Sequence, residues 1–367
     1  MKVAVGLSGG VDSSVAALLL REQGHEVVGI TMKLWRPGRY KGGDNGSCFG
    51  PGEEENIARA SETAARLGIP YRVYDVFEEY DRAVVGYFRD TYLSGRTPNP
   101  CVRCNELVKF GLLPRLARAA GLDFDAFATG HYARIGEKLK VKGERVEVKG
   151  EGAEGEGKRY FLRRAKDAAK DQSYFLYRLS QEQLAQTLFP LGEMEKAEVR
   201  AVARKAGLDV ANRPDSQDFY SGDQAELIGV PDREGNIVDV HGKVLGRHRG
   251  YWHYTIGKRK GLGIGGGTPY YVVDLNACRN EVIVGFKEDA VRTELSVADM
   301  VWGALEPTDE PIPCRVKVRS AGEPKGPATL VGDRCVFPNG ISGIAPGQSA
   351  VFYSADSDEI LCGGIIQ

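Results

Sequence analysis

Short apolar runs alternate with amphipathic stretches through the first two hundred residues of the chain. Each run is bounded by polar or glycine-containing segments, which predicts β-strands at 3–5, 26–32, 71–76 and 125–132. Residues 53–67 place apolar side chains at helical spacing, as at Ile57, Ala60 and Ala64, and another helix is expected over 80–93. Strands and helices that alternate in this way predict a parallel sheet with helices on both faces.

The pattern changes towards the C-terminus. Alternating apolar residues among glycine and glutamate runs predict a β-hairpin insertion over 136–163, and helices are expected at 180–187 and 196–206. Short alternating runs between glycine turns follow, and the residues after 286 predict a small barrel. We therefore expect an α/β domain over 1–215, a small β-rich central domain over 216–285 and a β-barrel domain over 286–367.

The composition is that of a globular protein without a membrane span. Hydrophobic residues make up 42% and charged residues 27% of the 367 residues, and no stretch of about eighteen apolar residues occurs. The formal net charge is −1, so a nucleic-acid partner requires local basic patches. Seven cysteines without an export signal favour a reducing cytoplasm, where thiols are catalytic, metal-binding or buried.

A glycine-rich turn between the first strand and the first helix is the strongest candidate site. Residues 6–14 have the sequence Gly-Leu-Ser-Gly-Gly-Val-Asp-Ser-Ser. Gly9 and Gly10 allow a close backbone approach, and the amides and dipole at the helix start favour an anion such as phosphate. Asp12 suits such a site when Mg²⁺ bridges it to phosphate. The turn lacks the Walker and dinucleotide fingerprints, and an ordinary strand-to-helix turn is the alternative interpretation.

A Cys-x-x-Cys pair is the second candidate site. Cys101 and Cys104 follow a segment with two prolines that predicts a rigid, non-helical entry to a helix. A thiol near a helix N-terminus has a lowered pKa, and Arg103 and Lys109 would add to this effect if they lie close. Three interpretations stay open: a redox pair, half of a zinc site, or a sulfur-handling pair, alone or together with Cys48 from the glycine-rich loop at 35–52.

Longer motifs follow in a fixed order along the chain, at 6–14, 32–35, 95–105, 128–133, 170–176, 213–218, 254–263 and 345–353. Any one of them is a weak signal. Together they resemble the tRNA-specific 2-thiouridylase family, which belongs to the PP-loop ATP pyrophosphatases. The resemblance spans nearly the whole chain. It implies an α/β fold with a Rossmann-like, parallel-sheet PP-loop domain, a small central domain and a C-terminal β-barrel.

The resemblance also implies an activity, that of a tRNA-uridine 2-sulfurtransferase. Such an enzyme adenylates the C2 oxygen of the wobble uridine (position 34) with ATP and Mg²⁺, and then replaces it with sulfur. The implied partners are the anticodon stem-loop of tRNA and a sulfur donor protein or sulfide, in the cytoplasm and without a membrane. A helical part at 166–215 would contact the tRNA.

Roles for individual residues follow from the same resemblance. The ATP site would comprise Gly6, Leu7, Ser8, Gly9, Gly10, Val11, Asp12, Ser13, Met32 and Gly130. The catalytic residues would be Asp12, Cys101 and the nucleophile Cys104. The tRNA would contact Asn99, Pro100, Cys101, His131, Lys170, Asp171, Gln172, Arg319, Ser320 and Gln348. A basic, aromatic segment at 251–260 also suits phosphate contact and base stacking.

One position departs from the family pattern. In most of the family a second catalytic cysteine, which carries a persulfide, follows the 213–218 motif, and here that position is Tyr220. In one account, Cys48, Cys101 and Cys104 are metal ligands that hold a [4Fe-4S] cluster, whose fourth iron carries the sulfur. In the other, Cys104 takes up sulfur alone, or one of the other two thiols replaces the missing cysteine.

Two further functions stay open on the sequence. Because of Tyr220, the chain could be a non-catalytic tRNA-binding relative that retains ATP. Against this alternative, an inactive site would have no chemical need of Asp12, Cys101 and Cys104 together. A PP-loop amide ligase that acts on a small carboxylate is the other alternative. The cysteine loop and the basic, aromatic segment have no evident use in such a ligase.

Overall fold

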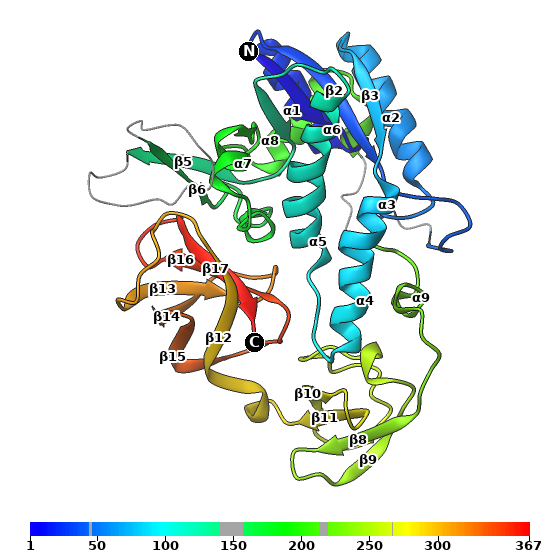
Figure 1. Ribbon diagram of the computed structural model, residues 1–367, viewed down its shortest axis with the longest axis vertical. Helices are drawn as coiled ribbons and strands as arrows, with labels where there is room; N and C mark the ends of the chain where they lie inside the picture. Colours follow the sequence, from blue (N-terminus) through cyan, green and yellow to red (C-terminus); the bar gives the residue numbers. More distant parts are fainter. Residues whose placement is uncertain (44–45, 140–156, 213–218, 266) are drawn as a thin grey trace.

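An α/β layer, a small β-sheet and a β-barrel make up the protein (Figure 1). The computed structural model describes residues 1–43, 46–139, 157–212, 219–265 and 267–367. The α/β layer lies at one end of the long axis and the small sheet at the other, with the barrel beside the helices that connect them. The predicted fold class is confirmed.

The α/β layer contains a parallel sheet in the order β3-β2-β1-β4-β7. Its strands are β1 (Lys2–Gly6), β2 (Glu26–Lys33), β3 (Tyr71–Asp75), β4 (Ala126–Thr129) and β7 (Thr187–Leu188). Successive residues of β1 pack on opposite faces, because strand side chains alternate. Val3 and Val5 pack with α1 (Val11–Glu22) and α2 (Glu53–Leu67), whereas Ala4 packs with Phe110 and Leu113 on the other face.

Further helices connect these strands or follow them. They are α3 (Phe77–Tyr80), α4 (Gly86–Leu93), α5 (Pro100–Arg103), α6 (Leu113–Ala119), α7 (Gln181–Ala185), α8 (Lys196–Lys205) and α9 (Gln224–Ile228). Residues 81–85 and 104–112 are π-helical and make α3–α4 and α5–α6 continuous. The predicted helix over 180–187 is too long, because Thr187 begins β7 beside Phe127 of β4.

A hairpin, the small sheet and the barrel account for the remaining strands. The hairpin pairs β5 (Arg134–Leu139) with β6 (Lys158–Arg163), and the tip of the predicted insertion lies outside the described residues. The small sheet has the order β10-β11-β8-β9, from β8 (Gly235–Asp239), β9 (Val244–His248), β10 (Tyr271–Asn276) and β11 (Glu281–Gly285). The closed barrel β12-β15-β14-β13-β16-β17 uses β12 (Val291–Trp302), β13 (Ile312–Lys317), β14 (Lys325–Val331), β15 (Arg334–Ser342), β16 (Ser349–Ser354) and β17 (Ile360–Ile366).

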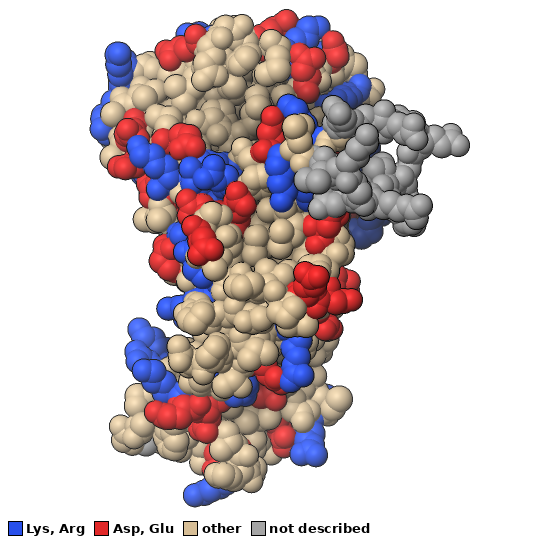
Figure 2. Space-filling view, turned by 90° about the vertical axis from the view of Figure 1, so that its left-hand side faces the viewer, with Lys and Arg blue, Asp and Glu red and all other residues tan. Residues whose placement is uncertain are grey.

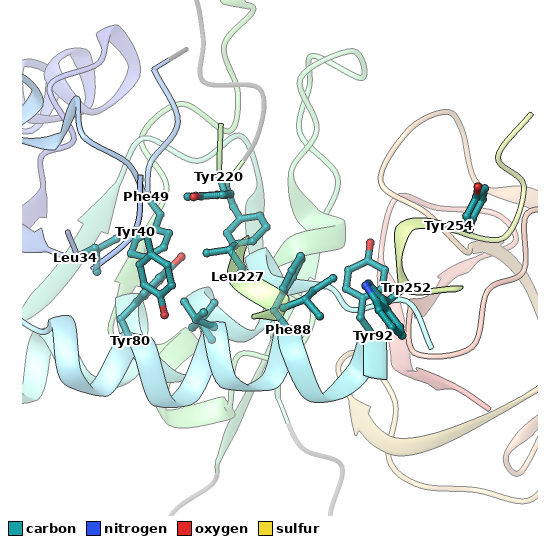
Figure 3. Packing of buried hydrophobic residues seen from close by; sticks show 14 of the residues in the cluster. Leu34, Tyr40, Phe49, Tyr80, Phe88, Tyr92, Tyr220, Leu227, Trp252 and Tyr254 are labelled. Carbon is teal, nitrogen blue, oxygen red and sulfur yellow. The ribbon is translucent and has the colours of Figure 1, made fainter. Parts of the chain in front are cut away.

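An aromatic core runs along the continuous helix α3–α4. Figure 3 shows Tyr80 and Tyr92 on this helix, with Phe49 and Tyr220 packed near Tyr80. Trp252, from the segment before the small sheet's second hairpin, packs beside Tyr92. The glycine-rich loop at 35–52 therefore contributes buried aromatic side chains to a core, a role that its polar composition does not indicate.

Positive and negative side chains are interspersed on the surface. On the face in Figure 2, Lys and Arg lie among Asp and Glu along the whole height of the molecule, in keeping with the net charge of −1. In the described part of the chain, no helix combines the length and the apolar character needed to cross a bilayer.

A buried charge cluster joins the α/β layer to the barrel. The side chain of Asp171 is 0% exposed and lies 3.5 Å from Arg164 and 3.9 Å from Lys317 of β13. Its carboxylate also accepts hydrogen bonds from the Ala165 amide (3.1 Å) and the Ser173 hydroxyl (3.0 Å). The tRNA contact expected of Asp171 stays a prediction, but this carboxylate already has a structural role in the free protein.

We expect Asp171→Ala to lower the free energy of unfolding by about 3–5 kcal/mol, because it leaves two buried cations without their shared anion. Urea denaturation measures this loss. The matched control is Asp358→Ala, whose carboxylate pairs with Arg134 but is 45% exposed. That variant should lose less than about 1 kcal/mol. Equal losses in the two variants would contradict a structural role for the Asp171 charge.

Candidate functional site

The glycine-rich turn is preformed at the end of β1. Gly9 has a φ of +70°, and a Cβ there would lie 2.3 Å from the carbonyl oxygen of Asn56. The Ser8 amide donates to the Ser13 hydroxyl (3.1 Å), which itself donates to the Gly10 carbonyl (3.2 Å). Gly10 provides no side-chain cap for α1, so the positive end of the α1 dipole faces the turn. This arrangement suits an anionic ligand.

Gly130, at the end of β4, packs against the same turn from the neighbouring strand. A Cβ on Gly130 would lie 2.5 Å from the amide nitrogen of Ser13 and 2.6 Å from the carbonyl carbon of Asp12. Only glycine allows this approach, because real Cβ atoms do not come within 3 Å of backbone. The ends of β1 and β4 therefore meet around the start of α1, where open α/β sheets bind ligands.

Asp12 is held by two residues that the sequence analysis did not assign to the site. Both carboxylate oxygens of Asp12 lie 2.8 Å from Nζ of Lys196, the first residue of α8. The Tyr132 hydroxyl also donates to Asp12 Oδ1 (2.8 Å), and Lys196 lies over the Tyr132 ring. The Lys196 side chain is 11% exposed, so this ion pair is largely shielded from solvent. No spacing in the sequence connects Lys196 to the turn.

A cavity of about 600 Å³ opens in front of the turn. Predicted site residues in its lining are Gly6, Leu7, Ser8, Gly10, Val11, Asp12, Ser13, Met32, Cys48, Gly130, His131, Lys170, Asp171, Gln172 and Ser320. Glu53 and Lys109 also line it, and the barrel contributes through Ser320 and Ala321. The remaining predicted residues, all within the described chain, lie outside this lining: Gly9, Asn99, Pro100, Cys101, Cys104, Arg319 and Gln348.

The two cysteines of the Cys-x-x-Cys pair lie in the first turns of a helix. The helix begins at Pro100, whose fixed φ and missing N–H suit a first helical position. The Asn99 side chain caps it by accepting a hydrogen bond from the Val102 amide (3.4 Å). The expected non-helical entry therefore ends at Asn99, and Cys101 already lies within the helix. A π-helical stretch begins at Cys104, and such stretches are frequent at functional sites.

Burial dominates the chemistry of the Cys104 thiol. Burial raises the pKa of Cys104 to about 12, although the Lys109 ammonium acts in the opposite direction. The expected lowering of the thiol pKa is therefore wrong for Cys104, because the effect of burial exceeds that of the Lys109 charge. Lys109 lies close as the sequence analysis anticipated, but Arg103 forms an ion pair with Glu106 instead (3.3 Å).

Cys48 lies beside the position where the family pattern has its second cysteine. Phe49 pairs with Tyr220 in an isolated parallel bridge, and the Phe49 amide donates to the Phe219 carbonyl (3.0 Å). Cys48 Sγ is 3.7 Å from that carbonyl, and its side chain is exposed to the cavity. Tyr220 itself is buried, and its hydroxyl donates to Glu226 and accepts from the Gly42 amide. The neighbouring motif at 213–218 lies outside the described residues.

Several residues implied as tRNA contacts are hydrogen-bonded within the protein. His131 Nδ1 is 2.7 Å from the Thr129 hydroxyl, and burial lowers the pKa of His131, so its imidazole is neutral at physiological pH. Gln172 Oε1 accepts from the Tyr132 amide (2.9 Å). Gln348 Nε2 donates to the Pro98 carbonyl (2.6 Å). Their contacts with tRNA stay predictions.

The basic, aromatic segment at 251–260 does not form a stacking platform. Trp252 is 7% and Tyr254 is 9% exposed, so both rings belong to the aromatic core. Lys258 is exposed and lines a second cavity of about 450 Å³, next to Asp223 at the start of α9. The expectation of base stacking here is wrong for these rings, since their faces are covered by protein.

Comparison with known proteins places every part of this fold in one family. Family models match residues 1–220 ("tRNA methyl transferase HUP domain"), 228–286 ("tRNA methyl transferase PRC-barrel domain") and 292–366 ("Aminomethyltransferase beta-barrel domain"). The tRNA-specific 2-thiouridylase MnmA of Endomicrobium trichonymphae is 44% identical over 100% of this chain and 99% of the relative. Proteins of the same name from Clostridioides difficile (strain 630) and Trichormus variabilis are 40% and 42% identical, over 100% of this chain and 98% of each relative. Because these relatives align with it from end to end, the chain belongs to the tRNA-specific 2-thiouridylase family.

Proposed function

We propose that this protein uses ATP to replace the C2 oxygen of a tRNA uridine, at the wobble position, with sulfur. The observation that carries the proposal is the cavity in which the turn at 6–14, Lys109 of the cysteine-bearing helix and Cys48 share one lining. An anion site and sulfur nucleophiles are both needed to activate and thiolate a carbonyl. The full-length relatives are named for this reaction, and they do not favour a non-catalytic tRNA-binding protein.

The first step is adenylation. The C2 oxygen of the uridine attacks the α-phosphorus of ATP, the bond to the β-phosphate oxygen breaks, and pyrophosphate leaves. The amides and the dipole at the start of α1 stabilise the charge that develops on the leaving pyrophosphate. A carbonyl oxygen is a poor leaving group, whereas the AMP formed from it is a good one. The uridine reaches such a cavity by leaving the anticodon stack, as single-stranded loops allow.

The carboxylate of Asp12 fits a Mg²⁺ ion that also binds ATP phosphates. Mg²⁺ is commonly held by one or two carboxylates together with substrate phosphates and water, and Asp12 provides one carboxylate at the cavity. Bound there, the ion would neutralise phosphate charge. In the free protein, Lys196 is the cation at this carboxylate. Lys196 keeps Asp12 oriented towards the turn and competes with a second cation for the same oxygens.

The second step transfers sulfur. A persulfide on Cys104 attacks C2 with its terminal sulfur and expels AMP. A second thiol then attacks the Cys104 sulfur, which releases 2-thiouridine and leaves a disulfide that a dithiol reductant must reduce. Cys48 is the thiol that supports this role best, because it is exposed to the cavity and lies beside residues 219–220. A sulfur donor protein that carries a persulfide would reload Cys104: the Cys104 thiolate attacks the outer sulfur of that persulfide, and the thiolate of the donor leaves.

The three thiols do not fit an iron–sulfur cluster as they are placed. Within the described residues, no group of three or more Cys, His, Asp or Glu side chains is arranged to hold a metal ion. Three thiolates also fall short of the four ligands that such a cluster usually has. Sulfur transfer in this proposal therefore runs through the thiols alone.

Adding tRNA, ATP, a sulfur donor protein that carries a persulfide and a dithiol reductant to the protein should release AMP and pyrophosphate in equal amounts, together with 2-thiouridine in the digested tRNA. Mass spectrometry and a pyrophosphate assay measure these products. Gly130→Ala should abolish both releases, because its Cβ displaces the backbone of Asp12 and Ser13. Gly52→Ala is the control, since a Cβ there meets nothing within 4 Å. Wild-type protein that binds tRNA but releases no AMP would overturn the proposal.

We expect Lys196→Met to lower the Mg²⁺ concentration that half-saturates pyrophosphate release by about tenfold, because a charged hydrogen-bonded competitor at Asp12 is removed. A Mg²⁺ titration at fixed ATP measures the change. Lys166→Met, which removes an exposed lysine near the start of α8, should leave the value unchanged. A Lys196→Met value equal to or above that of the wild type would rule out competition at Asp12.

The raised pKa of Cys104 predicts a specific pH dependence. Since only the thiolate is alkylated, the rate of Cys104 alkylation should rise about tenfold per pH unit from pH 7 to 9.5, without a plateau. Lys109→Met should slow the reaction at each pH, because Lys109 lowers this pKa, while Lys109→Arg keeps the charge and the rate. A plateau below pH 8 in the wild type would show that the thiol is activated instead.

A further inference from the structure

The backbone of the segment before Cys101 has few N–H groups with which to form hydrogen bonds inside the segment. Two of the four residues at 97–100 are prolines, so only Thr97 and Asn99 have an N–H group. The Thr97 amide donates to the carbonyl of Pro346 in the barrel (2.7 Å), and the Asn99 amide donates to the Tyr87 hydroxyl (3.2 Å). Both donors are therefore used by other parts of the protein, and one of these parts is the barrel.

Gln348, at the start of the barrel strand β16, holds a carbonyl of this segment. Its Nε2 donates to the Pro98 oxygen (2.6 Å) and lies 3.5 Å from the Thr97 oxygen. The Gln348 backbone is itself fixed, since its carbonyl accepts from the Ile366 amide (2.9 Å). The Tyr174 hydroxyl lies 3.5 Å from Gln348 Oε1, which orients the amide.

The barrel turn at Gly347 is in direct backbone contact with the segment at 97–100. Gly347 has a φ of +91°, and a Cβ there would lie 2.7 Å from the Thr97 carbonyl oxygen. One residue earlier in the segment, Arg96 Nη2 donates to the Ile366 carbonyl and to Gln367 Oε1, both at 3.0 Å. The last residues of the chain thus also bind this loop. Contacts of this density resemble a packed interior more than a hinge between independent domains.

We propose that Gln348 is a positioning residue whose side-chain amide, by holding the Pro98 carbonyl, fixes the start of the helix that carries Cys101 and Cys104. Pro98 precedes the helix cap Asn99, and Cys101 is the second helical residue, so a displacement at Pro98 passes directly to the thiols. The barrel is then part of the sulfur site. The inference rests on the proposed function in one respect, which is that these thiols transfer sulfur.

The proposal differs from a direct contact between Gln348 and tRNA, which the family resemblance implies. A tRNA contact affects the thiols only when tRNA is bound. A positioning contact affects them in the free protein, since the hydrogen bond to Pro98 exists without tRNA. The reactivity of the thiols in tRNA-free protein therefore separates the two roles, and it requires neither ATP nor turnover.

The experiment alkylates tRNA-free protein with iodoacetamide and follows each cysteine by mass spectrometry. Gln348→Glu keeps the size of the side chain but loses the donor, and Gln348→Leu removes both polar atoms. In each variant Cys101 and Cys104 should react about three- to tenfold faster than in the wild type, the change expected for one lost hydrogen bond that anchors a helix start. Thiolation turnover should fall, while the Kd for tRNA stays unchanged.

Two controls distinguish a local change at the start of the cysteine-bearing helix from a general loosening of the protein. Cys335 is 0% exposed in the barrel core and reports global loosening of the barrel. Gln186→Leu makes the same substitution at a position where the side chain accepts a hydrogen bond from Arg118, away from the cysteine segment. An increase at Cys101 and Cys104 with unchanged Cys335 supports the proposal. Unchanged or slower rates at Cys101 and Cys104, or a parallel increase at Cys335 or in Gln186→Leu, would overturn it.

Discussion

The contact between Gly130 and the start of α1 is the constraint on which the site depends. Two neighbouring parallel strands, β1 and β4, end at the same edge, and the backbone of one touches the first turn of the helix that follows the other. A Cβ at Gly130 would lie 2.5 Å from the amide nitrogen of Ser13 and 2.6 Å from the carbonyl carbon of Asp12, which is closer than van der Waals contact allows. This approach keeps the α1 amides at the cavity and orients Asp12 towards Lys196 and Tyr132. The geometry of the glycine-rich turn is therefore a consequence of strand packing.

Burial decides the chemistry of the thiols more than local sequence does. A cysteine in the first turn of a helix, with a lysine nearby, has the features that ordinarily activate a thiol. Here desolvation outweighs them at Cys104, so its resting form is the protonated thiol. Protection of the thiol in the free protein is a natural consequence, because a protonated thiol resists oxidation.

The barrel contributes side chains to the cavity and to the segments around it. It contributes Ser320 to the cavity lining, Lys317 to the buried charge cluster around Asp171, and Gln348 to the loop before the cysteines. Each of these contacts joins residues that are far apart in the sequence. A module that only captured tRNA would need none of them. The position of the thiols relative to the anion site is thus set jointly by the sheet and the barrel.

The sequence by itself determined the parallel α/β layer, the barrel and the glycine-rich turn between the first strand and the first helix, because these depend on local periodicity and on glycine at fixed places in a turn. It could not determine that Lys196, which is 184 positions from Asp12, occupies the carboxylate, or that Lys109 and not Arg103 faces the thiols. It also could not show that Tyr220 is packed into an aromatic core beside the Cys48 loop. Only tertiary structure decides such matters, since ion pairs and desolvation depend on which distant segments meet and on how much water they exclude.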